Sequence, residues 1–272
     1  MESILRLAYI SGILISAYMG ESWKNRHVWA GMFGAARGKT FGKFGSINYL
    51  MHEKHLFRVL AVAEMFYNLQ GKPGVRERAR GWLNEDIESV LGELQGVQLL
   101  HASGRDVEFN SPNNVKGENY DVRTFIEGGV SVACEIKTKF ENTGFSQATV
   151  RRTLEQACRQ LPSDGLTAII MKAPEQWFDQ IDARETLEAA TKDIFRQRSN
   201  ISAIFFHWEL WKQEGTSTVQ NFTVAKHIND DARQKHPELE DLIQAPLTHY
   251  KRLHEIVNIP HISFQSSEVE TA

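Results

Sequence analysis

The segment VSVACEIKTKF, residues 130–140, constrains the fold more than any other stretch of this chain. It alternates apolar and polar residues, as a β-strand does when successive side chains point to opposite faces. Val132 and Ile136 therefore share one face, whereas Glu135 and Lys137 share the other. The pattern predicts a strand that gives one face to a core and fixes an acid and a base on its other face.

The charged face has two interpretations from this strand alone. An antiparallel strand with one face in solvent shows the same alternation, so Glu135 and Lys137 also fit a solvated surface. The preceding segment, YDVRTFIEGG at residues 120–129, predicts a partner strand and a tight turn at the Glu-Gly-Gly sequence. With the turn centred near Gly128, the numbers of paired residues sum to 256, and Asp121 lies directly opposite Glu135.

This register brings two carboxylates together. Directly opposed residues have Cβ atoms about 5 Å apart, and two carboxylates at that distance repel each other by about 3 kcal/mol at an effective dielectric constant of ~20. Lys137 offsets part of this repulsion, and a divalent cation between Asp121 and Glu135 offsets more. Mg²⁺ suits the position because it binds one or two carboxylates and keeps several waters. We expect the backbone carbonyl of Ile136 as a further ligand.

The remaining segments predict an α/β fold. Around the hairpin, periodicity and the positions of Gly and Pro predict helices, strands and a polar loop. We expect helices at 47–69, 75–94, 145–161 and 176–198, strands at 97–101, 166–173 and 201–210, a loop or irregular hairpin at 102–119, and a further strand with one or two helices within 215–260. This order implies a mixed sheet with helices covering its faces.

The hairpin and its surroundings resemble the PD-(D/E)XK nuclease superfamily. The resemblance rests on Asp121, the hairpin, the sequence Glu135-Ile136-Lys137 at the end of an apolar strand, and the helix and apolar strand that follow; it covers about residues 80–210. It implies a restriction-endonuclease-like core at 75–214, between a mostly helical N-terminal region at 1–74 and a C-terminal extension at 215–272.

The resemblance also implies an activity, namely Mg²⁺-dependent hydrolysis of phosphodiester bonds, usually in DNA, with Mn²⁺ as an alternative ion. Asp121 and Glu135 would bind the metal, and Lys137 would position or activate a water. Members often add an acid from the preceding helix, for which Glu88 is the first candidate and Glu85 the next. Tyr120 stands where the motif has its proline, which is a departure from the pattern.

Two basic segments are candidates for nucleic-acid contacts. The predicted helix 145–161 carries Arg151, Arg152, Gln156 and Arg159 on a polar flank, and the Gly-rich segment 29–46 carries Arg37, Lys39 and Lys43 in a stretch without acids. Arginine binds phosphate through paired hydrogen bonds. The alternatives are exposed ion pairs among Arg151, Glu155 and Arg159 on the helix, and a linker that docks its aromatic residues in the Gly-rich segment.

Composition places the chain among ordinary globular proteins, and its cysteine content indicates the cellular compartment. Its 272 residues carry a formal charge of −3 and only two cysteines, which suits a reducing compartment, so we expect a cytoplasmic protein. The apolar run at residues 7–19 is shorter than the ~20 residues that span a bilayer. We expect it to form a packed helix without stable membrane association, with a membrane or secretory segment as the alternative.

The expected function is therefore a metal-dependent nuclease whose partner is nucleic acid, most simply DNA. Cleavage of both strands would need paired sites, which favours a homodimer or a larger complex. Two alternatives stay open from the sequence: a non-catalytic nucleic-acid-binding module on the same fold, and a protein-interaction module whose acids and lysines are solvated.

Overall fold

The computed structural model describes residues 2–29, 43–44, 47–48, 53–85, 87–110, 117–141, 143–214, 217–244 and 270–271. These residues form two compact units, one comprising the described residues up to Leu94 and the other those from Gln95 onward. The first unit is mostly helical, and the second contains a large sheet.

The first unit is built from α1 (Glu2–Lys24), α3 (Glu53–Leu69) and α4 (Val75–Gly81), with a short hairpin of β1 (Lys43–Phe44) and β2 (Ile47–Asn48). A π-helical turn, Asn25–Trp29, follows α1, and a 3₁₀ turn, Trp82–Asn84, follows α4. The α1 helix packs against α3, where the rings of Tyr18 and Phe66 stack 4.4 Å apart. The predicted helix at the N-terminal apolar run is confirmed.

Helix α5 (Ile87–Ala102) corrects the sequence prediction at two points. The expected helix 75–94 is broken after Asn84, and the expected strand 97–101 is helical. The prediction ended the helix before Gly96, but this glycine lies inside α5, where a Cβ atom would stand 2.8 Å from Cγ2 of Ile136. Gly96 therefore allows close packing against the sheet and does not end the helix.

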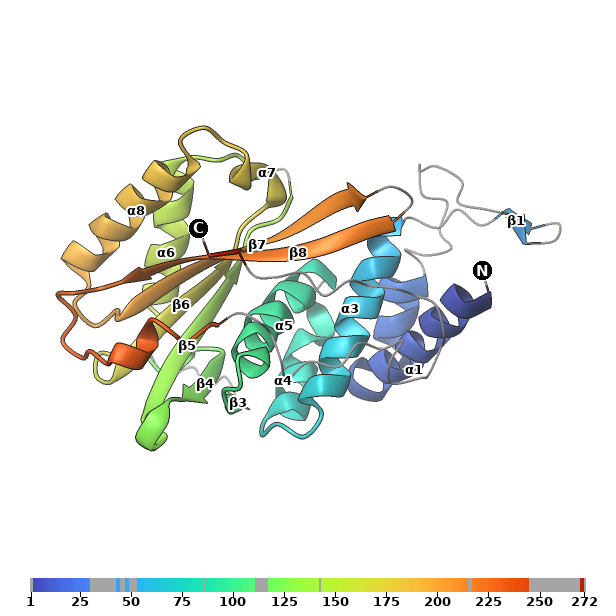
Figure 1. Ribbon diagram of the computed structural model, residues 1–272. Helices are drawn as coiled ribbons and strands as arrows, with labels where there is room; N and C mark the ends of the chain where they lie inside the picture. Colours follow the sequence, from blue (N-terminus) through green and yellow to red (C-terminus); the bar gives the residue numbers. More distant parts are fainter. Residues whose placement is uncertain are drawn as a thin grey trace. The chain divides into compact units, whose positions relative to one another are not determined.

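The sheet of the second unit has seven strands in the order β3-β4-β5-β6-β7-β8-β9 (Figure 1). They are β3 (Val107–Phe109), β4 (Val122–Phe125), β5 (Ser131–Thr138), β6 (Leu166–Lys172), β7 (Ala203–Glu214), β8 (Ser217–Ile228) and β9 (Glu270–Thr271). β5, β6 and β7 run parallel to one another. The pairs β3–β4, β4–β5 and β7–β8 are antiparallel. β3 lies inside the segment 102–119, which was predicted to be a loop or an irregular hairpin, and it pairs with β4 outside that segment.

The hairpin of β4 and β5 has the predicted register. Val122 pairs with Cys134 and Phe125 pairs with Ser131, and the turn between the strands places Gly128 and Gly129 at φ values of 72° and 74°. Only glycine adopts such values without strain. Val130 and Phe140 differ from expectation, because both lie beyond the strand and are exposed, 40% and 46% respectively.

Helices α6 (Gln147–Cys158) and α8 (Ala183–Gln197) pack on one face of the sheet, as Figure 1 shows. Ser146 caps α6 by accepting the N–H of Thr149 at 3.1 Å. The predicted helix 176–198 is divided into α7 (Glu175–Phe178) and α8. Ile181, in the turn between them, is fully exposed. A 3₁₀ turn, Pro237–Leu239, follows β8.

The second unit is thus an α/β structure with a mixed sheet flanked by helices, and this level of the predicted fold class is confirmed. Among the described residues, no helix is long and apolar enough to cross a membrane.

Candidate active site

Asp121 lies at the residue that precedes β4, next to the last hairpin pair. Its Oδ2 atom accepts the backbone N–H of Ile136 at 2.8 Å, and its backbone carbonyl accepts the N–H of Asn110 at 2.9 Å. Asp121 is 6% exposed. The hairpin register therefore delivers this carboxylate to the peptide that joins Glu135 to Ile136, as the paired numbering predicts.

Glu135 and Lys137 lie on the face of β5 that α6 and α8 cover. Glu135 is fully buried, and the ammonium of Lys137 donates hydrogen bonds to Oε1 of Glu135 and, at 2.6 Å, to Oε1 of Gln160 just beyond α6. The interpretation of Glu135 as part of a solvated strand face is wrong. A buried carboxylate needs a charge partner or hydrogen bonds to stay ionised, and Lys137 supplies both.

The charges of both carboxylates affect the pKa of the Cys134 thiol. Burial is the main cause that raises its pKa above the usual range, and the negative charges of Asp121 and Glu135 raise it further. The charges of Asp121 and Glu135 therefore both raise the pKa of Cys134 in β5. Cys134 stays a protonated, buried thiol, which excludes it as a nucleophile at neutral pH.

Basic side chains gather beside this acid pair. Lys139 follows β5, and its pKa is lowered first by burial and then by the charges of Arg152 and Lys137. Arg152 is one of the residues predicted to bind nucleic acid, and its charge reaches the end of the strand that carries Glu135. Lys139 was not predicted as a site residue, although it continues the alternation that contains Glu135 and Lys137.

Asp121 and Glu135 are the carboxylates predicted to bind Mg²⁺. Both offer hard carboxylate oxygens, and Mg²⁺ is commonly held by one or two carboxylates with water in its other positions. Within the described ranges, no group of three or more His, Cys, Asp or Glu side chains has the arrangement of a metal cage. The roles of Asp121, Glu135 and the Ile136 carbonyl as metal ligands stay predictions.

Glu88, the predicted additional ligand, lies in the first unit. Its carboxylate forms an ion pair with Arg58 at 2.5 Å, and both side chains are partly buried. Glu85 lies in the same unit and is exposed. Their role as metal ligands stays a prediction.

The residues predicted to contact nucleic acid have different surroundings. Arg151 forms an ion pair with Glu155 at 2.9 Å, which is the alternative considered for this helix, whereas Arg152 and Gln156 are exposed. Arg159 lines a cavity at the end of α6. Arg37 and Lys39 lie outside the described residues, and Lys43 is described only in its backbone, within β1.

A second buried polar cluster, which was not predicted, lies on the opposite face of the sheet. Lys172 of β6 pairs with Glu209 of β7 at 3.3 Å, and Gln95 of α5 donates to the same carboxylate oxygen at 3.0 Å. His207 is fully buried opposite Lys172, and neither of its ring nitrogens has a hydrogen-bond partner in the described part of the chain. Burial lowers the pKa of His207 to about 3, with a further contribution from the Lys172 charge.

Comparisons with protein-family models, curated proteins and solved structures found no match to this chain. The site is therefore interpreted from its own geometry.

Proposed function

We propose that this protein is a metal-dependent nuclease with a restriction-endonuclease-like core, acting on DNA. The observation that carries the proposal is the meeting of Asp121 with the Glu135-Ile136-Lys137 segment, where Asp121 binds the Ile136 N–H and Lys137 binds Glu135. Two acids and a lysine are held on a rigid hairpin, in the register expected for a PD-(D/E)XK site.

Asp121 and Glu135 would hold Mg²⁺ or Mn²⁺. A bound divalent ion stabilises charge on a phosphodiester and activates a water for attack. The protein contributes rigidity, because Asp121 is fixed by a backbone N–H and Glu135 by its neighbour on the strand. Fixed ligands reduce the reorganisation needed during the reaction.

Lys137 would orient the attacking water. Its side chain is a quarter exposed, and its ammonium is held between Glu135 and Gln160. An ammonium carries three donors, which leaves one for a water or a phosphate oxygen. Gln160 is then a positioning residue that sets the direction of the Lys137 side chain.

Arg152 and Lys139 would receive the nucleic-acid backbone beside the acids. Their positive charges influence each other across the end of β5, and Arg152 is exposed. Phosphate contacts of this kind position a nucleic acid without reading its sequence. They would also concentrate a polyanionic substrate near two buried carboxylates.

A cleavage assay tests this proposal. Single-stranded and double-stranded DNA and RNA are incubated with the protein in Mg²⁺, in Mn²⁺ and in chelator. We expect cleavage of DNA that requires the divalent ion, and a loss of at least about a hundredfold in Glu135→Gln and Lys137→Gln, since one misplaced catalytic group costs this much.

Glu188→Gln and Lys192→Gln are the matched controls, because this Glu-Lys pair lies on exposed positions of α8. Both controls should keep wild-type cleavage, and thermal unfolding should show that all four variants fold. Undiminished cleavage in folded Glu135→Gln and Lys137→Gln variants would refute the proposal.

A non-catalytic nucleic-acid-binding module is the second candidate. It is favoured by the hydrogen bonds that the Lys137 ammonium donates to Glu135 and Gln160, because these bonds already engage the predicted catalytic groups. This function predicts binding that weakens steeply with salt and needs no divalent ion. Binding without strand scission in either metal would favour it over the nuclease.

A further inference from the structure

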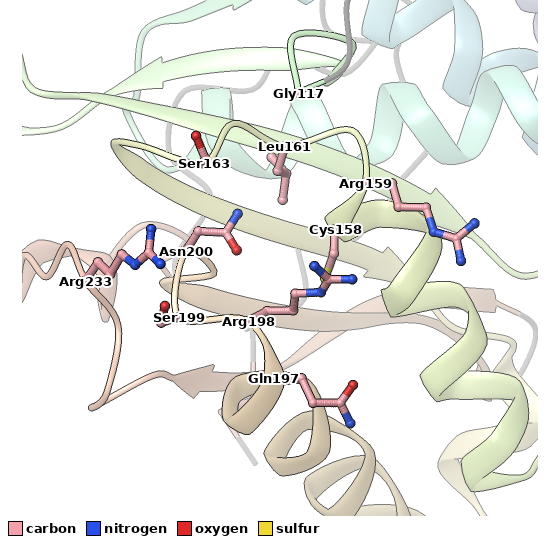
Figure 2. A pocket seen from close by; sticks show the side chains of 10 residues that line it. All are labelled: Gly117, Cys158, Arg159, Leu161, Ser163, Gln197, Arg198, Ser199, Asn200 and Arg233. Carbon is pink, nitrogen blue, oxygen red and sulfur yellow. The ribbon is translucent and has the colours of Figure 1, made fainter.

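A cavity of about 840 Å³ opens in the second unit, beyond the C-terminal end of α6 (Figure 2). It is lined by three arginines, Arg159, Arg198 and Arg233, together with the polar side chains of Ser163, Ser199 and Asn200. Its size falls in the range of roughly 300–1,000 Å³ typical of small-molecule sites. None of Asp121, Glu135 and Lys137 lines it.

Three loops that are distant in sequence build the walls. Arg159 follows α6, Arg198 follows α8, and Arg233 follows β8. The backbone N–H of Arg233 donates to the carbonyl of Ser199 at 2.7 Å, and the amide of Asn200 donates to the carbonyl of Pro162 at 2.8 Å. These hydrogen bonds tie the loops together, so the arginines are presented by a connected framework.

The cavity carries positive charge without a matching acid. Its lining contains no Asp or Glu, and among the described residues none of its three arginines forms an ion pair. Other arginines of the chain do pair, as Arg78 does with Glu93 at 2.5 Å. The C-terminal ends of α6 and α8 help to hold cations here, because helix C-termini carry partial negative charge. An anionic ligand would complete the balance.

The arrangement of the arginines indicates more than one anionic group. Figure 2 shows the Arg198 guanidinium beside Cys158, the Arg233 side chain directed toward Asn200, and the Arg159 side chain directed away from the other two arginines. The proximity of Arg198 to Cys158 is also visible in the thiol, because burial raises its pKa and the Arg198 charge counteracts this. Separated guanidinium groups suit successive phosphates better than one phosphate.

We propose that this cavity binds a ligand with two or more phosphate groups, through Arg198 and Arg233 with Arg159 at the rim. Guanidinium forks bind phosphate oxygens in pairs, and Ser163, Ser199 and Asn200 offer further polar groups. A nucleoside triphosphate and the backbone of a nucleic-acid strand both present this chemistry. The proposal does not depend on nuclease activity.

Isothermal titration calorimetry at low salt, without divalent ions, tests the proposal. The probes are a nucleoside triphosphate, the corresponding monophosphate and a short single-stranded DNA. We expect the triphosphate or the DNA to bind at least about tenfold more tightly than the monophosphate, and each of Arg198→Gln and Arg233→Gln to weaken that binding about tenfold.

Arg196→Gln is the matched control, because Arg196 is exposed on the last turn of α8, does not line the cavity and has a distant acid partner, Asp193, at 3.7 Å. It should bind like the wild type. Arg159 is left unchanged because its neighbour Gln160 holds Lys137.

The two sources give different results. Binding of the triphosphate alone identifies a nucleotide site, and binding of DNA that weakens in the same two variants identifies a track for the nucleic-acid backbone. Either result supports the cavity as a phosphate site, whether or not the protein cleaves DNA. No binding of either probe, or equal binding by the wild type and both folded variants, would overturn it.

Discussion

Two lysine–glutamate pairs lie in the same sheet, one on each face. Glu135 and Lys137 come from a single strand, β5, on the face that α6 and α8 cover. Lys172 and Glu209 come from neighbouring strands on the other face, where α5 supplies Gln95. The first pair has a second carboxylate beside it, Asp121, whereas the second pair has a neutral histidine.

This difference separates a candidate active site from a structural cluster. The first pair has two buried carboxylates beside one lysine, which is the composition that the proposed divalent ion would bind. The second pair is balanced by itself, and its histidine stays uncharged because burial lowers its pKa to about 3. Excess charge in a buried site has a cost, and such sites are more often functional than neutral ones.

The largest expected effect on stability comes from removing the lysine of the Lys172–Glu209 pair. Lys172→Met should lower the free energy of unfolding by about 3 kcal/mol, because it leaves Glu209 buried without its cation. Equilibrium unfolding in urea measures this, and Mg²⁺ should not restore the loss.

Lys192→Met is the control, since Lys192 pairs with Glu188 on the surface, and it should leave stability nearly unchanged. The double variant Lys172→Met/Glu209→Gln should recover part of the loss. A Lys172→Met protein as stable as the wild type would show that this cluster is hydrated and that the contrast between the two faces fails.

The next effect is a dependence on pH that belongs to the second cluster. His207 titrates near pH 3 in the folded protein and near 6.5 when unfolded, so between these values only the unfolded chain binds the proton. Stability is therefore retained above about pH 6.5 and falls as the pH decreases, by about 1.4 kcal/mol per unit.

Unfolding measured at pH 7 and pH 5 should show a loss of about 2 kcal/mol from this histidine. The His207→Leu variant should lack that part of the loss, while Lys172 and Glu209 remain in place. An identical pH dependence in the wild type and the variant would place a charged or solvated histidine in this cluster.

A smaller effect on stability tests the packing of α5 against Ile136 of β5. Gly96→Ala should lower the free energy of unfolding by about 1 kcal/mol, because the new methyl group meets Ile136 at 2.8 Å and this overpacking outweighs the gain in helix propensity. Gly81→Ala in α4 is the control, because nothing lies within 4 Å of its Cβ position. Thermal unfolding should show a slightly higher melting temperature for Gly81→Ala and a lower one for Gly96→Ala.

Local pattern explains what the sequence predicted well. The alternation of β5 and the double glycine of its turn determine a register that needs only neighbouring residues, so Asp121, Glu135 and Lys137 were found together. The strand predicted at 97–101 is helical, and the packing of Gly96 against Ile136 in that helix depends on a contact between distant segments.

The rest depends on contacts between distant segments. Lys172 and His207 meet only through the parallel register of β6 and β7, and the two strands were predicted simply as apolar segments. Arg159, Arg198 and Arg233 line one cavity because of loops that sequence spacing does not relate. Gln160 falls within the predicted helix 145–161, but its contact with Lys137 requires the packed structure.

Binding of Mn²⁺ tests the contrast between the two faces most directly, since the account assigns a divalent ion to one of them only. Calorimetric titration should show binding to the wild type and to Glu209→Gln, with affinity reduced at least about tenfold in the Asp121→Asn/Glu135→Gln double variant. Equal Mn²⁺ affinity in the wild type and that folded double variant would contradict the account.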